Sequence, residues 1–293
     1  MPVPVDLKKS VLQRINLNFS NSIELYLLRL DLIDTDISGN KWFKLKHNII
    51  EMQRQKKNTL LTYGGAFSNH IAATAKACKI YGVNAVGIIR GEEVNNHTLN
   101  QARKNGMKLF FVTRQLYRSK ELLKQYTLQQ FSENEIYIVP EGGANTLGAQ
   151  GSKEIADLIN VPFNYLVMAC GTGTTLAGVA SVLKTQQKVI GIPVLKGAYF
   201  LEKEIISLSA NEALGNFELC YDYHFGGYAK YTLELIGFIQ EFKQQYNIEL
   251  DFVYTGKMMY GVFDLIKQKY FPDNSVVIVI HSGGIQGNLG IGL

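Results

Sequence analysis

The stretch NYLVMACGTGTTLAG, residues 164–178, reads as a strand, a short loop and the start of a helix. NYLVMA is apolar and β-rich, and a helical pattern begins where the glycines and threonines end. Glycine lets the backbone approach a ligand closely, and the N–H groups at the start of a helix attract anions. The loop residues suited to hold a phosphate are Gly171, Thr172, Gly173, Thr174 and Thr175. The alternative is a plain helix-capping turn.

This loop does not carry a nucleotide-binding fingerprint. No Lys-Ser or Lys-Thr pair follows it in a GxxxxGK[ST] frame, so it is not a Walker loop. The dinucleotide pattern GxGxxG also fails, because the position of its third glycine is Leu176. The loop therefore favours a phosphate that is not part of a nucleotide, and a nucleotide-dependent α/β enzyme is the less favoured alternative.

On both sides of this stretch, β-rich runs alternate with helical patterns. The predicted strands are TLLTY (59–63), NAVGIIR (84–90), KLFFV (108–112), EIYIV (135–139), NYLVMA (164–169), KVIGIPV (188–194) and SVVIVI (275–280). Helices are expected from residue 42 onward and around 68–81, 94–106, 116–131, 146–160, 174–185, 229–246 and 257–269. Apolar strands separated by helices predict an α/β fold with a mostly parallel sheet covered on both faces.

Glycine-rich loops cluster on one side of the predicted strands. They are YGGAFSNH (63–70), EGGANTLGAQG (141–151), ACGTGTTLAG (169–178), HFGGYAK (224–230) and HSGGIQG (281–287). Four of the five follow an apolar strand directly, which places them at carboxyl ends of strands. Ligands of open α/β sheets bind in the crevice beyond those ends, so we expect the loops to share one ligand cleft.

Lys41 opens a helical pattern in SGNKWFKLKHN, residues 38–48. Helical steps of four from Lys41 reach Leu45 and Ile49, both apolar. This spacing predicts that Lys41 heads the buried stripe and that Lys44 lies on the solvent-exposed face. Burial lowers the pKa of a lysine and makes its amine nucleophilic, so Lys41 is a candidate for covalent chemistry. The alternative is a surface charge that reaches solvent from the first turn.

Hydroxyl groups stand beside several of the glycine loops. Ser68 could cap the helix that follows YGGAF, and the same helix start could hold a substrate carboxylate. Tyr228 lies in GGYAK and Tyr254 in DFVYTGK. The chain has 16 tyrosines, so a packing role is the default for either tyrosine taken alone. Their value as candidates depends on the other loops that surround them.

Composition and charge disfavour several classes of protein. A chain of 293 residues with 46% hydrophobic and 19% charged residues is typical of one large or two modest globular domains. The net charge of +5 is mild and no run of five basic residues occurs, so nucleic-acid binding is not indicated. VVIVI at 276–280 is too short to span a membrane, and the N-terminus lacks a signal core, so we expect a cytoplasmic protein. The three cysteines and five histidines show no metal-ligand spacing.

Taken together, five motifs resemble the pyridoxal-phosphate enzymes of fold type II. They are GNK before the first long helix, SNH after YGG, GTGTT, VYTGKMMYG and HSGG, and they span residues 38 to 287. The branch they resemble contains 1-aminocyclopropane-1-carboxylate (ACC) deaminase and D-cysteine desulfhydrase. The resemblance implies a two-domain α/β fold like that of tryptophan synthase β, with mostly parallel twisted sheets flanked by helices. It implies a smaller αβ domain at 44–147 and a larger cofactor-binding domain formed by 1–43 and 148–293.

The same resemblance implies which residues hold the cofactor, pyridoxal 5'-phosphate. Lys41 would bind its aldehyde covalently, and Asn69 would hydrogen-bond its ring hydroxyl. The loop 171–175 would hold its phosphate. Thr255 or Ser282 would contact the pyridine nitrogen.

Further roles implied by the resemblance concern a small amino-acid substrate. Ser68, Asn69 and His70 would bind it, and Ser68 could also act near its α-carbon. Tyr228 and Tyr254 would flank the reacting atoms as acid, base or nucleophile. A homodimer is expected from the resemblance alone.

Three departures from the ACC deaminase pattern favour D-cysteine desulfhydrase. ACC deaminases carry Glu in place of Thr255, SNQ in place of SNH, and Leu in place of Ser282, whereas D-cysteine desulfhydrases show SNH, VYTGK and HTGG. A hydroxyl holds a ring proton less firmly than a carboxylate, which fits β-elimination. We therefore expect a deaminase or lyase that releases pyruvate, ammonia and sulfide. The alternatives are ACC ring opening to 2-oxobutanoate and ammonia, or a cofactor-binding homologue without turnover, because Phe43 and Phe67 replace the usual arginine and glutamine.

Overall fold

The computed structural model describes residues 5–19, 22–34, 36–37, 39–209, 214–285 and 288. Its strands are β1 (Leu12–Ile15), β2 (Glu24–Arg29), β3 (Thr59–Gly65), β4 (Asn84–Arg90), β5 (Met107–Val112), β6 (Ile136–Val139), β7 (Tyr165–Cys170), β8 (Lys188–Pro193), β9 (Asn216–Leu219) and β10 (Val276–His281). Its α-helices are α1 (Lys41–Arg54), α2 (Asn69–Tyr81), α3 (His97–Lys104), α4 (Arg114–Arg118), α5 (Lys120–Gln130), α6 (Thr146–Ser152), α7 (Thr174–Ala180), α8 (Leu201–Leu208), α9 (Leu233–Tyr246) and α10 (Thr255–Lys267). All seven predicted strands are present, each within a residue or two of its expected bounds.

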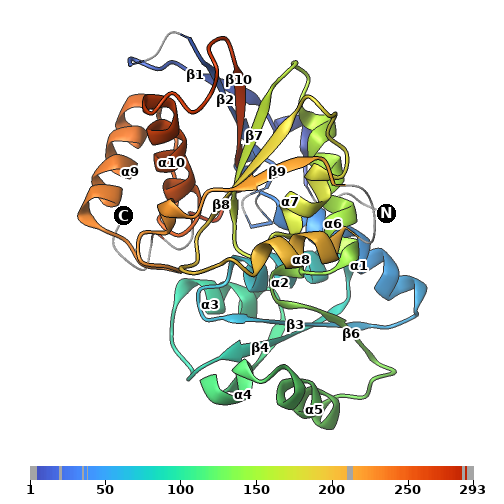
Figure 1. The fold of residues 1–293 in the computed structure, drawn as a ribbon. Helices are drawn as coiled ribbons and strands as arrows, with labels where there is room; N and C mark the ends of the chain where they lie inside the picture. Colours follow the sequence, from blue (N-terminus) through green and yellow to red (C-terminus); the bar gives the residue numbers. More distant parts are fainter. Residues whose placement is uncertain are drawn as a thin grey trace.

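The smaller sheet has the order β5-β4-β3-β6, and all of its neighbouring strands are parallel. Side chains alternate between its faces. Leu60 packs with α2 and α3 on one face, and Leu61 packs with α4 and α5 on the other. Figure 1 shows these two helical layers above and below the sheet. The predicted helix at 116–131 is two helices, because Ser119 ends α4 and caps α5 through a hydrogen bond from the Leu122 N–H.

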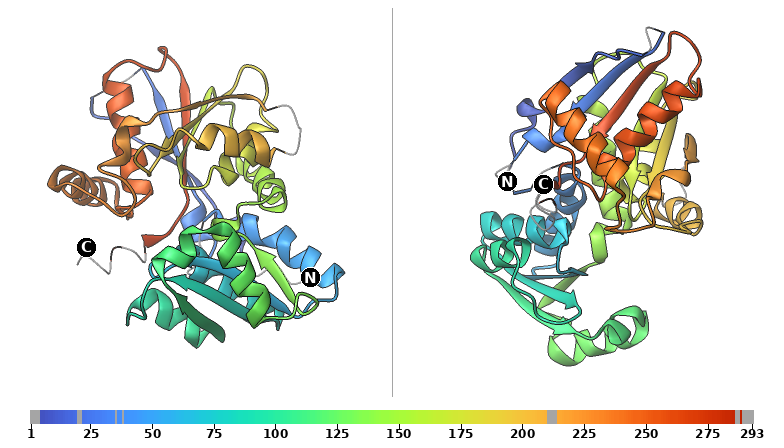
Figure 2. Two further views of the ribbon diagram at one scale, coloured as in Figure 1. Left: turned by 60° about the horizontal axis from the view of Figure 1, so that its bottom comes forward. Right: turned by 90° about the vertical axis from the view of Figure 1, so that its left-hand side faces the viewer.

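The larger sheet has the order β1-β2-β10-β7-β8-β9. Its strands are parallel except for β1, which pairs antiparallel with β2 at one edge. Helices α9 and α10 cover one face, and α6, α7 and α8 lie on the opposite side (Figure 1). Figure 2 shows the first pair lying across the sheet from another direction. Both sheets are therefore covered on both sides, as the apolar strands predict.

One hydrophobic core runs between the two sheets. It joins Leu60 of β3 and Ile71 of α2 to Leu166 of β7 and Ile278 of β10. The division into 44–147 and 1–43 plus 148–293 stays a prediction; its two boundaries fall inside α1 and α6. No helix within the described ranges combines the length and the apolar character that crossing a bilayer requires.

The prediction that Lys44 lies on the exposed face of its helix is wrong, because its side chain is only 6% exposed. Helix α1 packs against α6 as well as α2, so its polar face also meets protein. Asn48 on that face donates to the Lys44 carbonyl at 2.8 Å and exchanges hydrogen bonds with Asn145 at the start of α6. Polar residues of a buried network repeat at the same helical intervals as those of a solvent-exposed face. The spacing alone therefore does not distinguish the two.

Candidate active site

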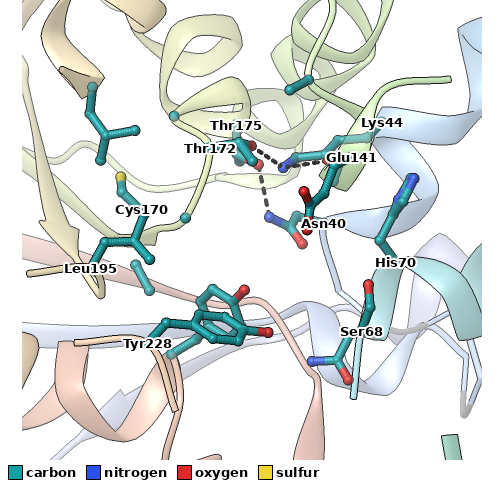
Figure 3. Close-up of a pocket in the computed structure, with 18 of the residues that line it drawn as sticks. Asn40, Lys44, Ser68, His70, Glu141, Cys170, Thr172, Thr175, Leu195 and Tyr228 are labelled. Atoms are coloured by element: carbon teal, nitrogen blue, oxygen red, sulfur yellow. Dashed lines mark hydrogen bonds between the residues drawn. The ribbon is translucent and has the colours of Figure 1, made fainter. Parts of the chain in front are cut away.

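A cavity of about 460 Å³ lies where the carboxyl ends of strands from both sheets meet. The loops after β3, β4 and β6 line it from the smaller sheet, and the loops after β7, β8 and β10 line it from the larger. Figure 3 shows Ser68 and His70 on one side and Cys170 and Leu195 on the other. The shared cleft expected from the glycine loops is thus present. Gln286 and Gly287 of the last glycine loop lie outside the described residues.

Lys41 is the first residue of α1, and its amine lies at the cavity wall. Its Nζ donates to Asn40 Oδ1 at 2.6 Å and lies 6.0 Å from the centre of the Tyr254 ring. Asn40 in turn donates through Nδ2 to Thr175 Oγ1 at 2.8 Å. Asn40 therefore links the Lys41 amine to the 171–175 loop. Burial lowers the pKa of Lys41 to about 8, although the Asp251 carboxylate opposes the shift. A substantial fraction of this amine is therefore neutral and nucleophilic near pH 8.

Lys44, one helical turn on, reaches the same cavity from α1. Its Nζ donates to the Gly142 carbonyl at 3.3 Å and to Thr172 Oγ1 at 3.5 Å (Figure 3). No ion pair involves it among the described residues. Burial, followed by repulsion from the Lys41 ammonium, lowers its pKa to about 7. Two desolvated amines on one wall make a site that an anion would stabilise.

The loop 171–175 turns the chain from β7 into α7. Gly173 has φ +72°, in the left-handed region that glycine adopts without strain, and it precedes the first helical residue. A β-carbon on Gly171 would lie 3.2 Å from the Tyr254 ring, so the loop backbone passes close beneath that ring. Thr172 and Thr175 line the cavity, whereas the Thr174 hydroxyl packs behind the loop against Thr172 at 2.8 Å.

The start of α2 brings three predicted substrate-binding residues to the cavity. Ser68 is the N-cap, and its Oγ accepts the Ile71 N–H at 3.3 Å. Asn69 donates through Nδ2 to the Gly284 carbonyl at 3.3 Å, and its Oδ1 is buried without a hydrogen-bond partner. A buried polar atom that lacks a partner and lines a cavity is available to a ligand.

His70 is buried beside Asn69, and its hydrogen bonds fix its tautomer. The Thr62 hydroxyl donates its one proton to the Val139 carbonyl at 2.8 Å, so it must accept from His70 Nε2 at 2.9 Å. Nδ1 therefore carries a lone pair, and it has no partner. Burial, followed by the charges of Lys44 and Lys41, lowers the pKa of His70 to about 3. The imidazole is a neutral acceptor at the cavity wall.

Tyr228 and Tyr254 meet on the side of the cavity that the larger sheet forms. Their ring centroids are 6.0 Å apart, with planes at 74°. Tyr228 is 38% exposed at the mouth, while its hydroxyl points inward (Figure 3). Burial raises the pKa of both phenols. Both are therefore protonated near neutral pH and can act as proton donors.

Thr255 and Ser282, the two candidates for contact with a ring nitrogen, differ in placement. Ser282 lines the cavity just beyond β10. Thr255 is fully buried, does not line the cavity, and donates its hydroxyl proton to Asp251 Oδ1 at 2.8 Å. Thr255 Oγ1 also accepts the Asp251 N–H at 2.8 Å, so the hydroxyl both donates and accepts within one turn.

Several residues at the cavity escaped the sequence reasoning. Asn40 stands in the GNK motif itself, but only its hydrogen bond to Thr175, 135 residues away, shows that it links Lys41 to the 171–175 loop. Lys44 was assigned to the wrong face. The cavity rim adds four charged residues: Arg90 at the end of β4, Lys120 at the start of α5, Glu141 just after β6 and Glu204 in the first turn of α8. Their only common signal in the sequence is position near an element's end.

The comparisons with known proteins agree with this geometry. Residues 17–283 match the family model described as "Pyridoxal-phosphate dependent enzyme". The chain belongs to this family. Its members are pyridoxal-phosphate-dependent enzymes, and this chain falls in the branch of ACC deaminase and D-cysteine desulfhydrase.

Relatives named as ACC deaminases and relatives named as D-cysteine desulfhydrases have similar sequence identity to this chain. A protein of Pyrococcus furiosus named "Putative 1-aminocyclopropane-1-carboxylate deaminase" is 33% identical over 92% of this chain and 87% of its own. A D-cysteine desulfhydrase of Yersinia pestis is 31% identical over 89% of this chain and 86% of its own. A crystal structure described as an ACC deaminase homologue superposes with a TM-score of 0.82 at 28% identity, covering 97% of this chain and 92% of that one. These figures do not separate the two substrates.

The residues present fit the cofactor that gives the pyridoxal-phosphate family its name. The aldehyde of pyridoxal 5'-phosphate needs a nucleophilic amine, which Lys41 offers. Its phosphate needs cations and hydroxyls, which Lys44 and Thr172 offer on the same wall. Its ring oxygen and nitrogen need polar partners, and Asn69 and Ser282 line the cavity for them.

Phe43 and Phe67, the two departures that raised the alternative of a homologue without turnover, do not line the cavity. Phe43 is fully buried in the core between the sheets. Phe67 is 54% exposed. Neither side chain blocks the space in front of Lys41, so the two substitutions give no structural reason for lost turnover.

Proposed function

We propose that this chain binds pyridoxal 5'-phosphate and catalyses β-elimination from a small amino acid of the D-cysteine type. Cysteine and one water would give pyruvate, ammonia and hydrogen sulfide. The observation that carries the choice is the absence of a buried carboxylate from the described cavity lining. The carboxylates there are Glu141 and Glu204, and both are exposed at the rim. A hydroxyl such as that of Ser282 polarises a ring nitrogen less strongly than a carboxylate, which suits a substrate with a good leaving group.

Each lining residue has a part in this proposal. When bound, pyridoxal 5'-phosphate supplies an electron sink for charge that develops at the substrate's α-carbon. Lys41 would hold the cofactor, and its amine, once displaced by the substrate, would remove the α-proton. Lys44, Thr172 and Thr175 would hold the phosphate, and Asn69 the ring hydroxyl. The loop residues Gly171, Gly173 and Thr174 would shape that phosphate site from the backbone.

The substrate would lie between the start of α2 and the two tyrosines. The Ser68 side chain and the N–H groups that open α2 would bind its carboxylate. The neutral His70 would accept a hydrogen bond without adding charge. Tyr228, whose hydroxyl points into the cavity, would donate a proton to the departing sulfur, and Tyr254 would orient Tyr228. Thr255 would support this site from behind, through Asp251.

Spectroscopy and a substrate panel test the proposal together. Protein reconstituted with pyridoxal 5'-phosphate should be yellow, and borohydride should abolish the visible band by reducing the linkage to Lys41. Lys41→Ala should lack the band, while Lys46→Met, a lysine on the same helix paired with Glu154, should keep it. The panel should include D- and L-cysteine, D- and L-serine and ACC, assayed for ammonia, 2-oxo acid and sulfide. A colourless reconstituted protein would refute cofactor binding.

ACC is the second candidate substrate, because the Pyrococcus furiosus relative carries that name at 33% identity. Release of 2-oxobutanoate from ACC without sulfide from D-cysteine would favour ring opening over the leading proposal. A yellow protein that releases ammonia from no member of the panel would favour a cofactor-binding homologue without turnover. Assembly as a homodimer is proposed from the family resemblance, and sedimentation velocity tests it.

A further inference from the structure

Lys257, the third residue of α10, is a lysine with no exposed surface. Its Nζ donates to the His224 carbonyl at 2.9 Å and to the Gly227 carbonyl at 2.7 Å. No carboxylate forms an ion pair with it among the residues that the structure describes. Burial lowers its pKa to about 8, and the more distant charge of Asp251 opposes the shift. Burying a lysine without a carboxylate partner destabilises the fold more than burying an apolar side chain of similar length. The hydrogen bonds that Lys257 donates are therefore the feature that can explain its presence.

The two carbonyls belong to a loop with unusual backbone geometry. Four of the five residues from 225 to 229 have positive φ: Phe225 (50°), Gly226 (89°), Gly227 (119°) and Ala229 (53°). Positive φ is strained for residues other than glycine, and it persists where surrounding contacts enforce it. The fifth residue of the 225–229 loop is Tyr228, whose hydroxyl points into the cavity (Figure 3).

Each carbonyl already accepts one backbone hydrogen bond. The Gly227 N–H donates to His224 O at 3.0 Å, and the Lys230 N–H donates to Gly227 O at 3.1 Å. Lys257 adds the second bond to both and so bridges two consecutive turns of the same loop. Without that ammonium, the two turns would be joined only through the strained residues between them.

Lys257 also joins this loop to the other tyrosine. Tyr254 immediately precedes α10, and Lys257 lies three residues further along. One helical turn therefore carries one tyrosine of the pair and the donor that fixes the other. We propose that Lys257 is a positioning residue, which holds the 225–229 loop so that the Tyr228 hydroxyl stays beside Tyr254 at the reacting atoms.

Other contacts anchor the start of the loop and leave its tip to Lys257. Tyr223 donates to Asp264 Oδ2 at 2.9 Å, and Phe225 packs edge-on against Tyr260 with ring centroids 5.0 Å apart. Both partners are on α10, so the segment before the loop stays attached when Lys257 is changed. The expected effect of losing Lys257 is thus local loosening around Tyr228, with the rest of the fold retained.

Hydrogen exchange of the reconstituted protein tests the loop-holding role directly. Lys257→Met keeps an unbranched side chain only one atom shorter and removes the donors. Peptides covering 222–231 should exchange about tenfold faster than in the wild type, as for the loss of one or two buried hydrogen bonds. Lys267→Met, which removes an exposed ammonium from the same helix, should leave those peptides unchanged. Unchanged exchange at 222–231 in folded Lys257→Met would overturn the proposal.

Turnover gives a second test, and this one rests on the proposed function. Tyr228→Phe should lower kcat, and Lys257→Met should lower it in the same direction with the visible cofactor band retained. The double variant should be no slower than Tyr228→Phe, because Lys257 acts only through that tyrosine. Additive losses would show that Lys257 acts elsewhere. If no amino acid is turned over, the function proposal fails and hydrogen exchange still decides the role of Lys257.

Should Lys257→Met not fold, Lys257→Gln keeps two N–H donors on a shorter side chain. Its exchange at 222–231 should lie between the wild type and a loosened loop, with peptides from α9 and the rest of α10 unchanged. Equal acceleration across all of these peptides would mean that Lys257 is a general stability residue, which also overturns the proposal.

Discussion

The backbone of Gly39 packs directly onto the carbonyl of Ser282: a β-carbon on Gly39 would lie 1.7 Å from that oxygen. Gly39 has φ +68° and precedes Asn40 and Lys41, whereas Ser282 follows the last strand of the larger sheet. Two motifs 243 residues apart are thus in backbone contact beneath the cavity. The positions of the Lys41 amine and the Ser282 hydroxyl depend on one another.

Gly39→Ala should therefore damage the site as well as the fold. We expect strong destabilisation, because backbone atoms must move apart, and loss of the visible cofactor band in whatever protein folds. Gly82→Ala is the matched control: Gly82 has φ +65° with no atom within 4 Å of a β-carbon, so only the conformational cost of about 1 kcal/mol remains. Thermal unfolding compares the two variants. Equal shifts in Tm would contradict the contact with Ser282.

Lys44→Met should weaken binding of the cofactor's phosphate. A hydrogen bond to a charged group contributes about 1.5–3 kcal/mol, so the dissociation constant for pyridoxal 5'-phosphate should rise roughly ten- to hundredfold. Binding of pyridoxal, which lacks the phosphate, should change little. Fluorescence titration of both compounds against wild type and Lys44→Met gives the ratio. A parallel loss of affinity for both would place Lys44 elsewhere in the site.

The depressed pKa of Lys44, about 7, also predicts a pH-dependent stability. In the unfolded chain a lysine stays protonated to about pH 10.4, so between pH 7 and that value the unfolded state binds more protons and stability rises with pH. Below pH 7 the cost of the buried ammonium is fully present. Without cofactor, Lys44→Met should thus raise Tm more at pH 6 than at pH 9. A constant difference in Tm would rule out this shift.

His70 should stay neutral well into acid, with its proton on Nε2. Its pKa of about 3 lies below that of an unfolded histidine, about 6.5, so the unfolded state binds the extra proton first. Stability contributed by the neutral ring is complete above pH 6.5 and is lost as pH falls toward 3. His70→Gln should flatten that acid limb, and His97→Gln, at an exposed position, should not. Long-range ¹⁵N–¹H NMR of the imidazoles reads the tautomer; a protonated His70 at pH 5 would contradict it.

Thr255→Val and Ser282→Ala should have opposite signatures. Thr255→Val removes a donor and an acceptor from the Asp251 turn, which should cost about 1–3 kcal/mol of unfolding free energy and leave the visible band in place. Ser282→Ala should shift the band and cost little stability. Urea unfolding and absorbance spectra distinguish the two, with Thr255→Ser as the control that keeps the hydroxyl. A spectral shift in Thr255→Val alone would assign the ring contact to Thr255.

Most of the strands that the sequence predicts are buried on both faces; the edge strand β5, with Lys108 exposed, is an exception. Their runs are almost purely apolar, so β4 and β8 stand out without any tertiary information. Strands β1, β2 and β9 were missed because LQRI, ELYLLR and NFEL are short and mix polar with apolar residues. Helix α8 was also missed, because it follows a run of loop residues and was read as part of that loop.

The convergence of the glycine loops was predictable, because parallel strands bring their carboxyl ends to one edge. The hydrogen bonds in and around the cavity were not. Asn40 with Thr175, Thr62 with Val139, and Lys257 with Gly227 each depend on how segments far apart in the sequence pack together. Lys44 shows the same limit, since periodicity identifies a polar face but does not tell whether water or another helix covers it.

The position of β10 between β2 and β7 has a consequence for biosynthesis. The smaller sheet is complete once residue 139 has left the ribosome, and it can form while the rest of the chain is still being made. The larger sheet remains in two pieces, each with an open edge, until residues 276–281 emerge and join them. Ser282 arrives with that last strand. Assembly of the catalytic cleft is therefore one of the final events of synthesis, and ribosome-stalled chains that stop before residue 276 cannot contain it.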